Sequence, residues 1–198
     1  MDKLDLVGIG IGPFNLSLAA QLDGVADVFS IFLEQRSEFA WHPDMMLPGV
    51  ELQTSFLKDL VTLTNPTSKW SFLSYMVGQK RMLDFMNADF AAVPRREFAA
   101  YLKWVADHLE GLAFDNVVRE VAFDGQDFKV RTDHTSYVTS NLAIGVGKPA
   151  FIPAWARQLP KHKCFHTSQA KSNLPKLLSE KLREGQYQVL LKHHLKIL

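Results

Sequence analysis

The spacing of hydrophobic residues changes along this chain, and these changes mark the expected strands and helices. Residues 4–9 and 28–33 are short apolar runs that are typical of buried parallel strands. Between them, residues 13–22 carry a helical pattern, and Gly24 is a plausible end for that helix. A strand, a glycine-rich turn, a helix and a strand within about thirty residues predict one βαβ unit.

The middle of the chain adds helices to this unit. Residues 35–69 hold little regular pattern apart from the run SFLKDLV. They are too long for a plain connection, so we expect function or extra structure there. Apolar residues recur at helical spacing over residues 70–86. Pro94 then opens an amphipathic helix that stops before Gly111. The pattern predicts a helical insertion over about residues 56–110.

Three strand-like runs follow the insertion, at residues 117–123, 128–132 and 137–144, with turn-like stretches between them. They predict a small antiparallel sheet. A further helix is expected over residues 172–183, and a strand is expected to begin at Tyr187. The expected fold class is therefore α/β, with a Rossmann-like βαβ core, a helical insertion and a small antiparallel sheet.

The amino-acid composition limits the classes of protein to which the chain can belong. Hydrophobic residues make up 47% of the 198 positions, which is enough for a core. Lys and Arg number 22 against 21 for Asp and Glu, so the charge gives no case for nucleic acid or a membrane surface as a partner. The single cysteine, Cys164, excludes an internal disulfide and suits a reducing compartment.

The sequence predicts neither a targeting segment nor a metal site. The start MDKLDLVGIG lacks the basic and apolar regions of a signal peptide, and no apolar run reaches the ~18 residues of a membrane span. We therefore expect a soluble cytoplasmic protein with no membrane span. Lys192, His193 and His194 resemble a charged tail, because no further ligand stands at a suitable spacing.

The turn after the first strand, in the sequence LVGIGIGPFNLSLAAQL, has the form of a dinucleotide-binding fingerprint. Its glycines, and the proline that stands where a third fingerprint glycine is usual, are Gly8, Gly10, Gly12 and Pro13. We expect Gly8 to permit the tight turn and Gly10 to let a pyrophosphate approach the backbone. Pro13 suits the first helical turn, which needs no N–H there. Asn15 could add a polar contact near the phosphates.

An acidic residue supports a nucleotide site. Glu34 ends the second strand, 24 residues after Gly10, near the ~20 expected for a carboxylate that binds a ribose hydroxyl. A carboxylate there repels the 2′-phosphate of NADP, so the site should take FAD or NAD. The alternative is a glycine turn in an unrelated α/β protein, because a lone glycine fingerprint is weak evidence.

Three segments resemble one family of flavoenzymes. They are GIGIGPFNLS, FAWHPDMMLPGVELQTSFLKDLVTLTNPTSKWSFLSYM and RREFAAYLKWVA. In order and spacing they are similar to the flavin-dependent N-hydroxylating monooxygenases, the L-lysine N6- and L-ornithine N5-monooxygenases of siderophore biosynthesis. The likeness runs from about residue 4 to about residue 170. The family's fingerprint also has proline at its third position, which Pro13 matches. The resemblance implies an FAD-binding domain over residues 1–170 and the start of an NADPH-binding domain over 171–198.

The resemblance also implies which residues form the site. Trp41 and His42 would lie near the isoalloxazine of FAD, Gln53 would lie beside its reactive edge, and the backbone of Val118 would contact the adenine end. Lys58, with Gln53 nearby, would bind the carboxylate of the substrate. The full set implied for the cofactor is Gly8, Gly10, Gly12, Pro13, Glu34, Gln35, Trp41, His42, Gln53 and Val118.

No catalytic residue is assigned by this pattern. Without the family pattern, Trp41 and His42 would be interpreted as ordinary core groups. Gln53 and Lys58 would be interpreted as solvated loop residues.

The activity implied by the resemblance is FAD- and NADPH-dependent hydroxylation of the side-chain amine of L-lysine or L-ornithine, as in an L-lysine 6-monooxygenase. FAD supplies the oxygen chemistry, while the protein orients the substrate and excludes water. A carboxylate-binding Lys58 favours an amino acid over a simple diamine, and overall likeness favours lysine slightly over ornithine. An oligomer is possible for this family.

The end of the chain departs from the family pattern. The family continues into a second glycine-rich turn that opens the NADPH domain, whereas the residues after Tyr187 contain no glycine. We therefore expect a truncated form, and we expect this chain alone to have no substantial NADPH-dependent hydroxylase activity. The alternatives are a catalytically inactive FAD-binding fragment and a diamine N-monooxygenase relative. An unrelated NAD-dependent dehydrogenase fits the middle third poorly.

Overall fold

The computed structural model describes residues 3–160 and 164–175. Its α-helices are α1 (Pro13–Leu22), α2 (Phe72–Gly78), α3 (Met82–Asn87) and α4 (Arg95–His108). Its strands are β1 (Leu4–Ile9), β2 (Ser30–Leu33), β3 (Leu112–Ala113), β4 (Val118–Phe123), β5 (Phe128–Thr132) and β6 (Ser136–Ile144). Short 3-10 helices are η1 (Pro43–Met45), η2 (Ala156–Gln158) and η3 (Thr167–Gln169).

All six strands form one mixed sheet in the order β3-β2-β1-β6-β5-β4. β1 pairs in parallel with β2 and with β6, so that Val7 lies opposite Ile31 on one side and Leu142 on the other. β5 runs antiparallel to both β6 and β4. The α/β class with a Rossmann-like parallel core is confirmed. One detail differs, because β6 joins the antiparallel strands to β1 and the sheet is therefore continuous.

The helical insertion is also confirmed, although its first part is broken. The run predicted as one helix over residues 70–86 forms two short helices, α2 and α3. Ser71 caps α2, because its hydroxyl oxygen accepts a hydrogen bond from the Ser74 N–H at 3.1 Å. Lys80 then takes a left-handed conformation with φ of 57°, which no helix can continue through. α4 starts directly after Pro94 and ends before Gly111, as predicted.

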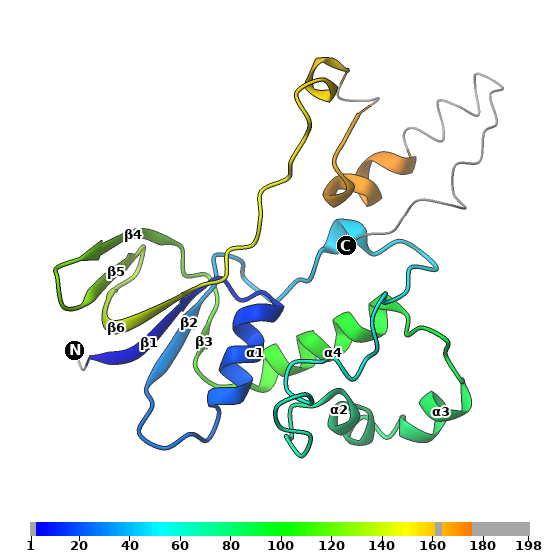
Figure 1. The fold of residues 1–198 in the computed structure, drawn as a ribbon, viewed down its shortest axis with the longest axis horizontal. Helices are drawn as coiled ribbons and strands as arrows, with labels where there is room; N and C mark the ends of the chain where they lie inside the picture. Colours follow the sequence, from blue (N-terminus) through cyan, green and yellow to red (C-terminus); the bar gives the residue numbers. More distant parts are fainter. Residues whose placement is uncertain (1–2, 161–163, 176–198) are drawn as a thin grey trace.

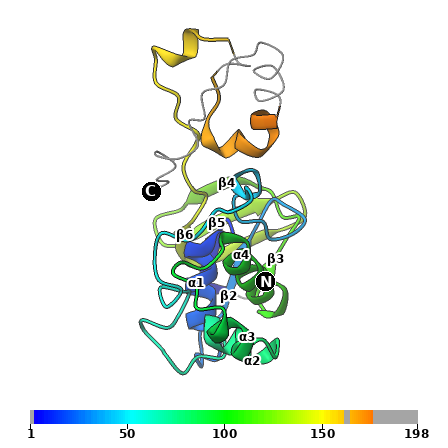
Figure 2. The ribbon, with the colours of Figure 1, turned by 90° about the vertical axis from the view of Figure 1, so that its right-hand side faces the viewer.

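The main core lies between the sheet and the helices. Figures 1 and 2 show α1 next to the parallel strands, with α4 beside it and the short helices α2 and α3 beyond. Phe32 from β2, Leu16 from α1 and Tyr101 from α4 are fully buried in this core. A smaller cluster around Val7 and Val130 covers the other face of the sheet. Burial of these apolar side chains is the main source of stability of the scaffold that carries the turn.

After β6 the chain runs away from the sheet as an extended segment and then turns back, which both ribbon views show. On its return η3 contacts η1, and the Ser172 hydroxyl donates to the Asp44 carboxylate at 3.1 Å. Residues 170–175 are helical, in agreement with part of the predicted helix. The rest of that helix and the strand predicted at Tyr187 lie outside the described residues. The space-filling view shows hydrophobic residues exposed over a broad part of one face.

Candidate functional site

The glycine-rich turn follows β1 and makes a close contact with the residues after β6. Gly10 has a φ of 85°, and a Cβ added there would lie 2.7 Å from the carbonyl oxygen of Gly145. The Gly145 N–H donates to the Ile9 carbonyl at 2.8 Å. Position 10 therefore favours glycine for two reasons. Its backbone is left-handed, and it closely approaches the backbone of Gly145.

Gly8 has a different role from the one predicted. It lies within β1, and a Cβ added there would lie 2.0 Å from the ring of Phe32. The absence of a side chain at Gly8 lets Phe32 pack flat against the strand, whereas Gly10 makes the turn. The prediction that Gly8 permits the tight turn is therefore wrong. Glycine is still required at this position, because a side chain would collide with Phe32.

The start of α1 presents free donors. Gly12 is the N-cap and Pro13 is the first helical residue, as expected for a residue that has no N–H. Within the described part of the chain, the N–H groups of Gly12 and Phe14 donate to no acceptor. Such groups, together with the positive end of the helix dipole, form a ready anion site.

Glu34 reaches the same turn from the end of β2. Its Oε2 accepts a hydrogen bond from the Ile11 N–H at 2.9 Å, and its Oε1 accepts one from the Arg36 N–H at 3.1 Å. The carboxylate is therefore fixed beside the backbone of the glycine turn. Gln35 follows as an exposed residue. Val118, at the start of β4, packs against the cluster that holds Leu33, directly before Glu34.

Asn15 does not contact the outside of the turn. It is fully buried, and its Nδ2 donates to the carbonyls of Ile9 at 3.2 Å, Gly10 at 2.8 Å and Ala143 at 3.1 Å. The side chain thus joins α1 to β1, to the glycine turn and to β6. The prediction that Asn15 adds a contact near the phosphates is wrong, because its amide donors are committed to backbone carbonyls.

Trp41 and His42 lie in the loop after β2. Their rings stand 5.7 Å apart between centroids, and Trp41 meets the edge of Phe98 at 5.8 Å. The Arg95 guanidinium carbon lies 4.4 Å from the centre of the Trp41 ring, which is a cation–π contact. His42 is in the left-handed region, with φ of 46°. Trp41 is thus partly a core group, whereas His42 is the more exposed of the two.

Two groups at this loop have shifted pKa values, and burial is the main cause of both shifts. Partial burial lowers the pKa of His42, and the positive charges of Arg95 and Arg36 lower it further. Burial also lowers the pKa of Arg95 from its ordinary value. Arg95 forms no ion pair among the described residues, and its Nε is buried without a hydrogen-bond partner. No sequence pattern selects Arg95 over Arg96, because the distinction lies in its partial burial and its contact with Trp41.

Gln53 is held beside the start of α4. The Leu52 N–H donates to the Val93 carbonyl at 2.8 Å, and the Arg95 N–H donates to the Val50 carbonyl at 2.9 Å. These bonds fix the backbone immediately before Gln53, while the Gln53 side chain is exposed. Gln53 therefore lies near the segment that carries Arg95, which in turn covers Trp41.

Lys58 is placed in the turn that follows. Its N–H donates to the Ser55 carbonyl at 3.0 Å, and its side chain is exposed. Across the described ranges, Lys58 takes part in no salt bridge. The structure therefore leaves its ammonium available to an anion.

Arg36 links the two groups of predicted residues. Its N–H binds Glu34 beside the glycine turn, and its Nη1 donates to the Ala40 carbonyl at 2.7 Å, directly before Trp41. One side of the candidate site is therefore the glycine turn with Glu34, and the other is the Trp41 loop.

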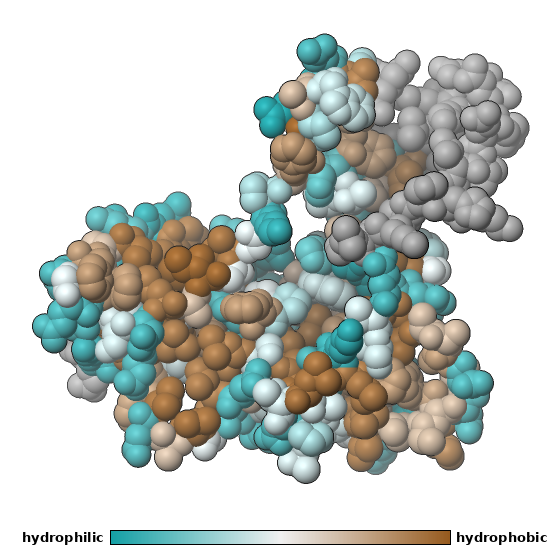
Figure 3. Space-filling view, viewed as in Figure 1, coloured by the Kyte–Doolittle hydropathy of each residue, from teal (hydrophilic) through white to brown (hydrophobic). Residues whose placement is uncertain are grey.

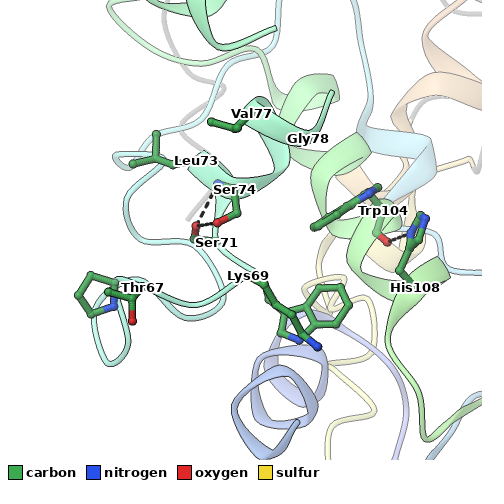
Figure 4. Close-up of a pocket in the computed structure, with 11 residues that line it drawn as sticks. Thr67, Lys69, Ser71, Leu73, Ser74, Val77, Gly78, Trp104 and His108 are labelled. Atoms are coloured by element: carbon green, nitrogen blue, oxygen red, sulfur yellow. Dashed lines mark hydrogen bonds between the residues drawn. The ribbon is translucent and has the colours of Figure 1, made fainter. Parts of the chain in front are cut away.

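One pocket in the described part of the chain lies away from the predicted site residues. It has a volume of about 660 Å³ and is lined from α2, α4 and the loop before α2, as Figure 4 shows. Its polar groups are already engaged, since Lys69 pairs with Asp23 at 2.8 Å and the His108 ring bonds the Trp104 carbonyl at 2.7 Å. None of the predicted site residues lines this pocket, and it offers no reactive group.

The described residues hold neither a metal-binding cluster nor a membrane-spanning helix. No group of His, Cys, Asp and Glu there has the arrangement of a metal site. No described helix is long and apolar enough to cross a membrane.

A family model for L-lysine 6-monooxygenase/L-ornithine 5-monooxygenase matches residues 2–186. The chain belongs to this family. Its members are N-hydroxylating flavin monooxygenases of siderophore biosynthesis, which act on lysine, ornithine or diamines. The L-lysine N6-monooxygenase of Escherichia coli is 34% identical over 182 residues, which are 91% of this chain and 43% of that enzyme.

Two solved structures of the family share the fold. The FAD-bound cadaverine monooxygenase of the desferrioxamine pathway from Erwinia amylovora superposes with a TM-score of 0.84 at 34% identity, covering 89% of this chain and 43% of that one. The ornithine N-hydroxylase of Kutzneria sp. 744, with reduced FAD, NADP⁺ and L-ornithine, gives a TM-score of 0.79 at 32% identity, covering 88% and 44%. The chain therefore spans about two-fifths of the length of these family members.

Proposed function

We propose that this chain forms the FAD-binding part of an NADPH-dependent monooxygenase that hydroxylates the side-chain amine of L-lysine, or of L-ornithine, for a hydroxamate siderophore. The observation that carries the choice of an amino acid is the exposed Lys58, whose ammonium meets no acid among the described residues. In this proposal residues 1–170 form the FAD-binding domain, and residues 171–198 begin the NADPH-binding domain.

The glycine turn fits the dinucleotide part of FAD. The free N–H groups of Gly12 and Phe14 would hold the pyrophosphate at the positive end of α1. Gly10 allows the close approach of the backbone, and Glu34 would accept from a ribose hydroxyl. Glu34 also disfavours a 2′-phosphate, so FAD fits this turn better than NADP does.

Apolar side chains around the turn support the same assignment. Phe14 is 75% exposed, and Ile144 and Val146, which flank the Gly145 contact, are 66% and 68% exposed. Large apolar groups gathered around one turn favour a surface that a ligand covers. The flat aromatic rings of a dinucleotide cofactor suit these groups better than water does.

The loop that carries Trp41 and His42 is the proposed place of the isoalloxazine, with Gln53 at its reactive edge and Val118 at the adenine end. When bound and reduced by NADPH, FAD supplies the oxygen chemistry of the reaction. The chain's own contribution there is to orient the ring against Trp41 and to exclude water. Arg95 places a positive charge behind Trp41, at 4.4 Å from the indole.

Lys58 is proposed to bind the substrate carboxylate. An ammonium that pairs with the carboxylate turns the far end of the amino acid, with its amine, toward the flavin. A diamine has no carboxylate for Lys58, and like charges would repel it. This argument favours L-lysine or L-ornithine over cadaverine, although family members act on each class.

The test is a calorimetric titration of the FAD-loaded chain with L-lysine, L-ornithine and cadaverine. We expect the amino acids to bind more tightly than cadaverine, and we expect Lys58→Met to abolish that preference. Lys80→Met, which removes another exposed lysine without an ion pair among the described residues, is the matched control and should change nothing. Equal binding of L-lysine by the wild type and Lys58→Met would overturn the role of Lys58.

The reaction itself is tested by following hydroxylamine formation from the same three amines in a fusion of this chain with the C-terminal part of a family member. Faster hydroxylation of cadaverine than of L-lysine would favour the second candidate, a diamine N-monooxygenase. Retention of FAD without any hydroxylamine product would favour the third, a flavin-binding protein that does not catalyse the reaction.

A further inference from the structure

The turn that carries Lys58 is anchored on both sides. Before it, Phe56 packs against Phe72 and Phe85, each at 5.3 Å between ring centroids. After it, Leu60 is buried in the main core. Lys58 itself is exposed, so a mobile cationic side chain is mounted on a short segment with fixed ends.

The Asp59 carboxylate accepts four hydrogen bonds that hold this turn. Its Oδ1 accepts from the N–H groups of Val61 at 3.0 Å and Thr62 at 2.7 Å. Its Oδ2 accepts from the Thr62 hydroxyl at 2.7 Å and from the Phe72 N–H at 2.7 Å. Phe72 is the first residue of α2, so the carboxylate joins the Lys58 turn to a helix N-terminus, where a negative charge is stabilised.

Two other helices hold the next residue, Leu60. Its carbonyl accepts from the Ser17 hydroxyl on α1 at 2.5 Å. Its N–H donates to the hydroxyl oxygen of Tyr101 on α4 at 3.3 Å, and that hydroxyl donates to the Trp70 carbonyl at 2.7 Å. The backbone directly after Lys58 is thus bound to α1, α2 and α4 together.

The same contacts prevent Asp59 from forming an ion pair with Lys58. Adjacent Lys and Asp side chains could pair with each other and cancel the charge that a substrate carboxylate needs. Here both Asp59 oxygens are occupied by four donors, and the described residues show no Lys58–Asp59 ion pair. The carboxylate fixes the turn while the ammonium stays free.

We propose that Asp59 is a positioning residue for Lys58, and that it sets the preference of the site for substrates that carry a carboxylate. An exposed ion pair on mobile groups contributes little, because ordering the side chains offsets the attraction. Fixing the backbone under Lys58 removes part of that cost. The inference rests on the proposed function, since it needs Lys58 to bind the substrate carboxylate.

The first measurement needs no ligand. Backbone ¹⁵N relaxation of the chain gives the order parameter at Lys58 in the wild type and in Asp59→Asn. We expect a value of about 0.85 in the wild type and below about 0.6 in the variant, with Ile11 in the glycine turn unchanged. Asp107→Asn makes the same chemical change on the exposed face of α4 and should leave both values as they are. An unchanged order parameter at Lys58 in Asp59→Asn would overturn the proposal.

The second measurement separates positioning from a general structural role. In the FAD-loaded chain, Asp59→Asn should raise the dissociation constant for L-lysine about fivefold or more and leave those for cadaverine and FAD unchanged. Equal losses for L-lysine and cadaverine would overturn the proposal. If instead Lys58→Met retains full L-lysine affinity, the proposed function fails at Lys58, which is a distinct result.

A milder variant covers the case in which Asp59→Asn does not fold. Thr62→Val removes one of the four donors to Asp59 and keeps the carboxylate. It should lower the order parameter at Lys58 and the affinity for L-lysine by smaller amounts. A folded Thr62→Val protein with wild-type order at Lys58 and wild-type preference for L-lysine would contradict the proposal.

Discussion

The Ile11 N–H donates to Glu34 Oε2 at 2.9 Å, and this bond ties the end of β2 to the glycine turn after β1. The contact fixes the acidic side chain at the place where a nucleotide ribose would follow the pyrophosphate. It also satisfies one backbone donor that would otherwise face the ligand. Glu34 therefore shapes the turn and offers an acceptor there.

Replacing Glu34 should weaken FAD binding. Glu34→Ala removes the bond to Ile11 and the ribose acceptor, so we expect a loss of about 1 kcal/mol or more, which is at least about a fivefold rise in the dissociation constant. Flavin fluorescence during titration measures this dissociation constant. Glu38→Ala, an exposed acid four residues on, is the control. Equal FAD affinity in Glu34→Ala and the wild type would show that this carboxylate does not contact the cofactor.

Gly10→Ala should damage both stability and binding. The new Cβ would lie 2.7 Å from the Gly145 carbonyl, and φ of 85° is unfavourable for any L side chain. Gly24→Ala is a matched control, because φ there is 78° but no atom lies within 4 Å. Urea unfolding and FAD titration should show a larger loss for Gly10→Ala than the ~1–2 kcal/mol strain shared by both. Equal effects at the two positions would argue against the close contact with Gly145.

Asn15→Ala should destabilise the chain even without FAD. The fully buried amide donates to three carbonyls, and its loss removes all three hydrogen bonds, although the Ile9 carbonyl keeps its bond from the Gly145 N–H. We expect the free energy of unfolding in urea to fall by about 2–4 kcal/mol. Gln21→Ala, on the exposed side of the same helix, should change it by less than about 0.5 kcal/mol. A stable Asn15→Ala protein that has lost only FAD affinity would restore the phosphate-contact interpretation.

The lowered pKa of His42 predicts a loss of stability in acid. In the unfolded chain this histidine takes up a proton near pH 6.5, whereas the folded chain takes it up only at a lower pH. The unfolded state therefore binds more protons in that window, and stability falls as the pH drops below about 6.5 toward the lowered value. His42→Asn, which tolerates φ of 46°, should reduce the difference between urea midpoints at pH 7.5 and pH 5. An identical difference in both proteins would contradict it.

The sequence predicts the parts of the fold that depend on local patterns. The run Leu4–Ile9, the helix Pro13–Leu22 and the position of Gly10 follow from apolar spacing and from the φ that only glycine adopts easily. The division of residues 70–86 into two helices depends on the left-handed Lys80, and lysine gives no sign of that conformation. The pairing of β6 with β1 depends on the global sheet and not on a local pattern.

The residues of the candidate site also differ in whether the sequence predicts them. Glu34 follows from its distance along the chain after the glycine turn, and Lys58 follows only from the family pattern. Asn15 and Asp59 could not be assigned from sequence, because polar residues of their type are equally common on exposed turns. Their roles arise from partners far along the chain, such as Ala143 and Phe72.

Calorimetric titration of the purified chain with FAD tests whether the glycine turn and Glu34 form an FAD site. A parallel titration with NADP⁺ gives the comparison, since Glu34 disfavours its 2′-phosphate. We expect saturable binding of one FAD per chain and no measurable heat from NADP⁺ over the same range. A chain that is folded by circular dichroism yet binds no FAD, or that binds NADP⁺ more tightly than FAD, would contradict this expectation.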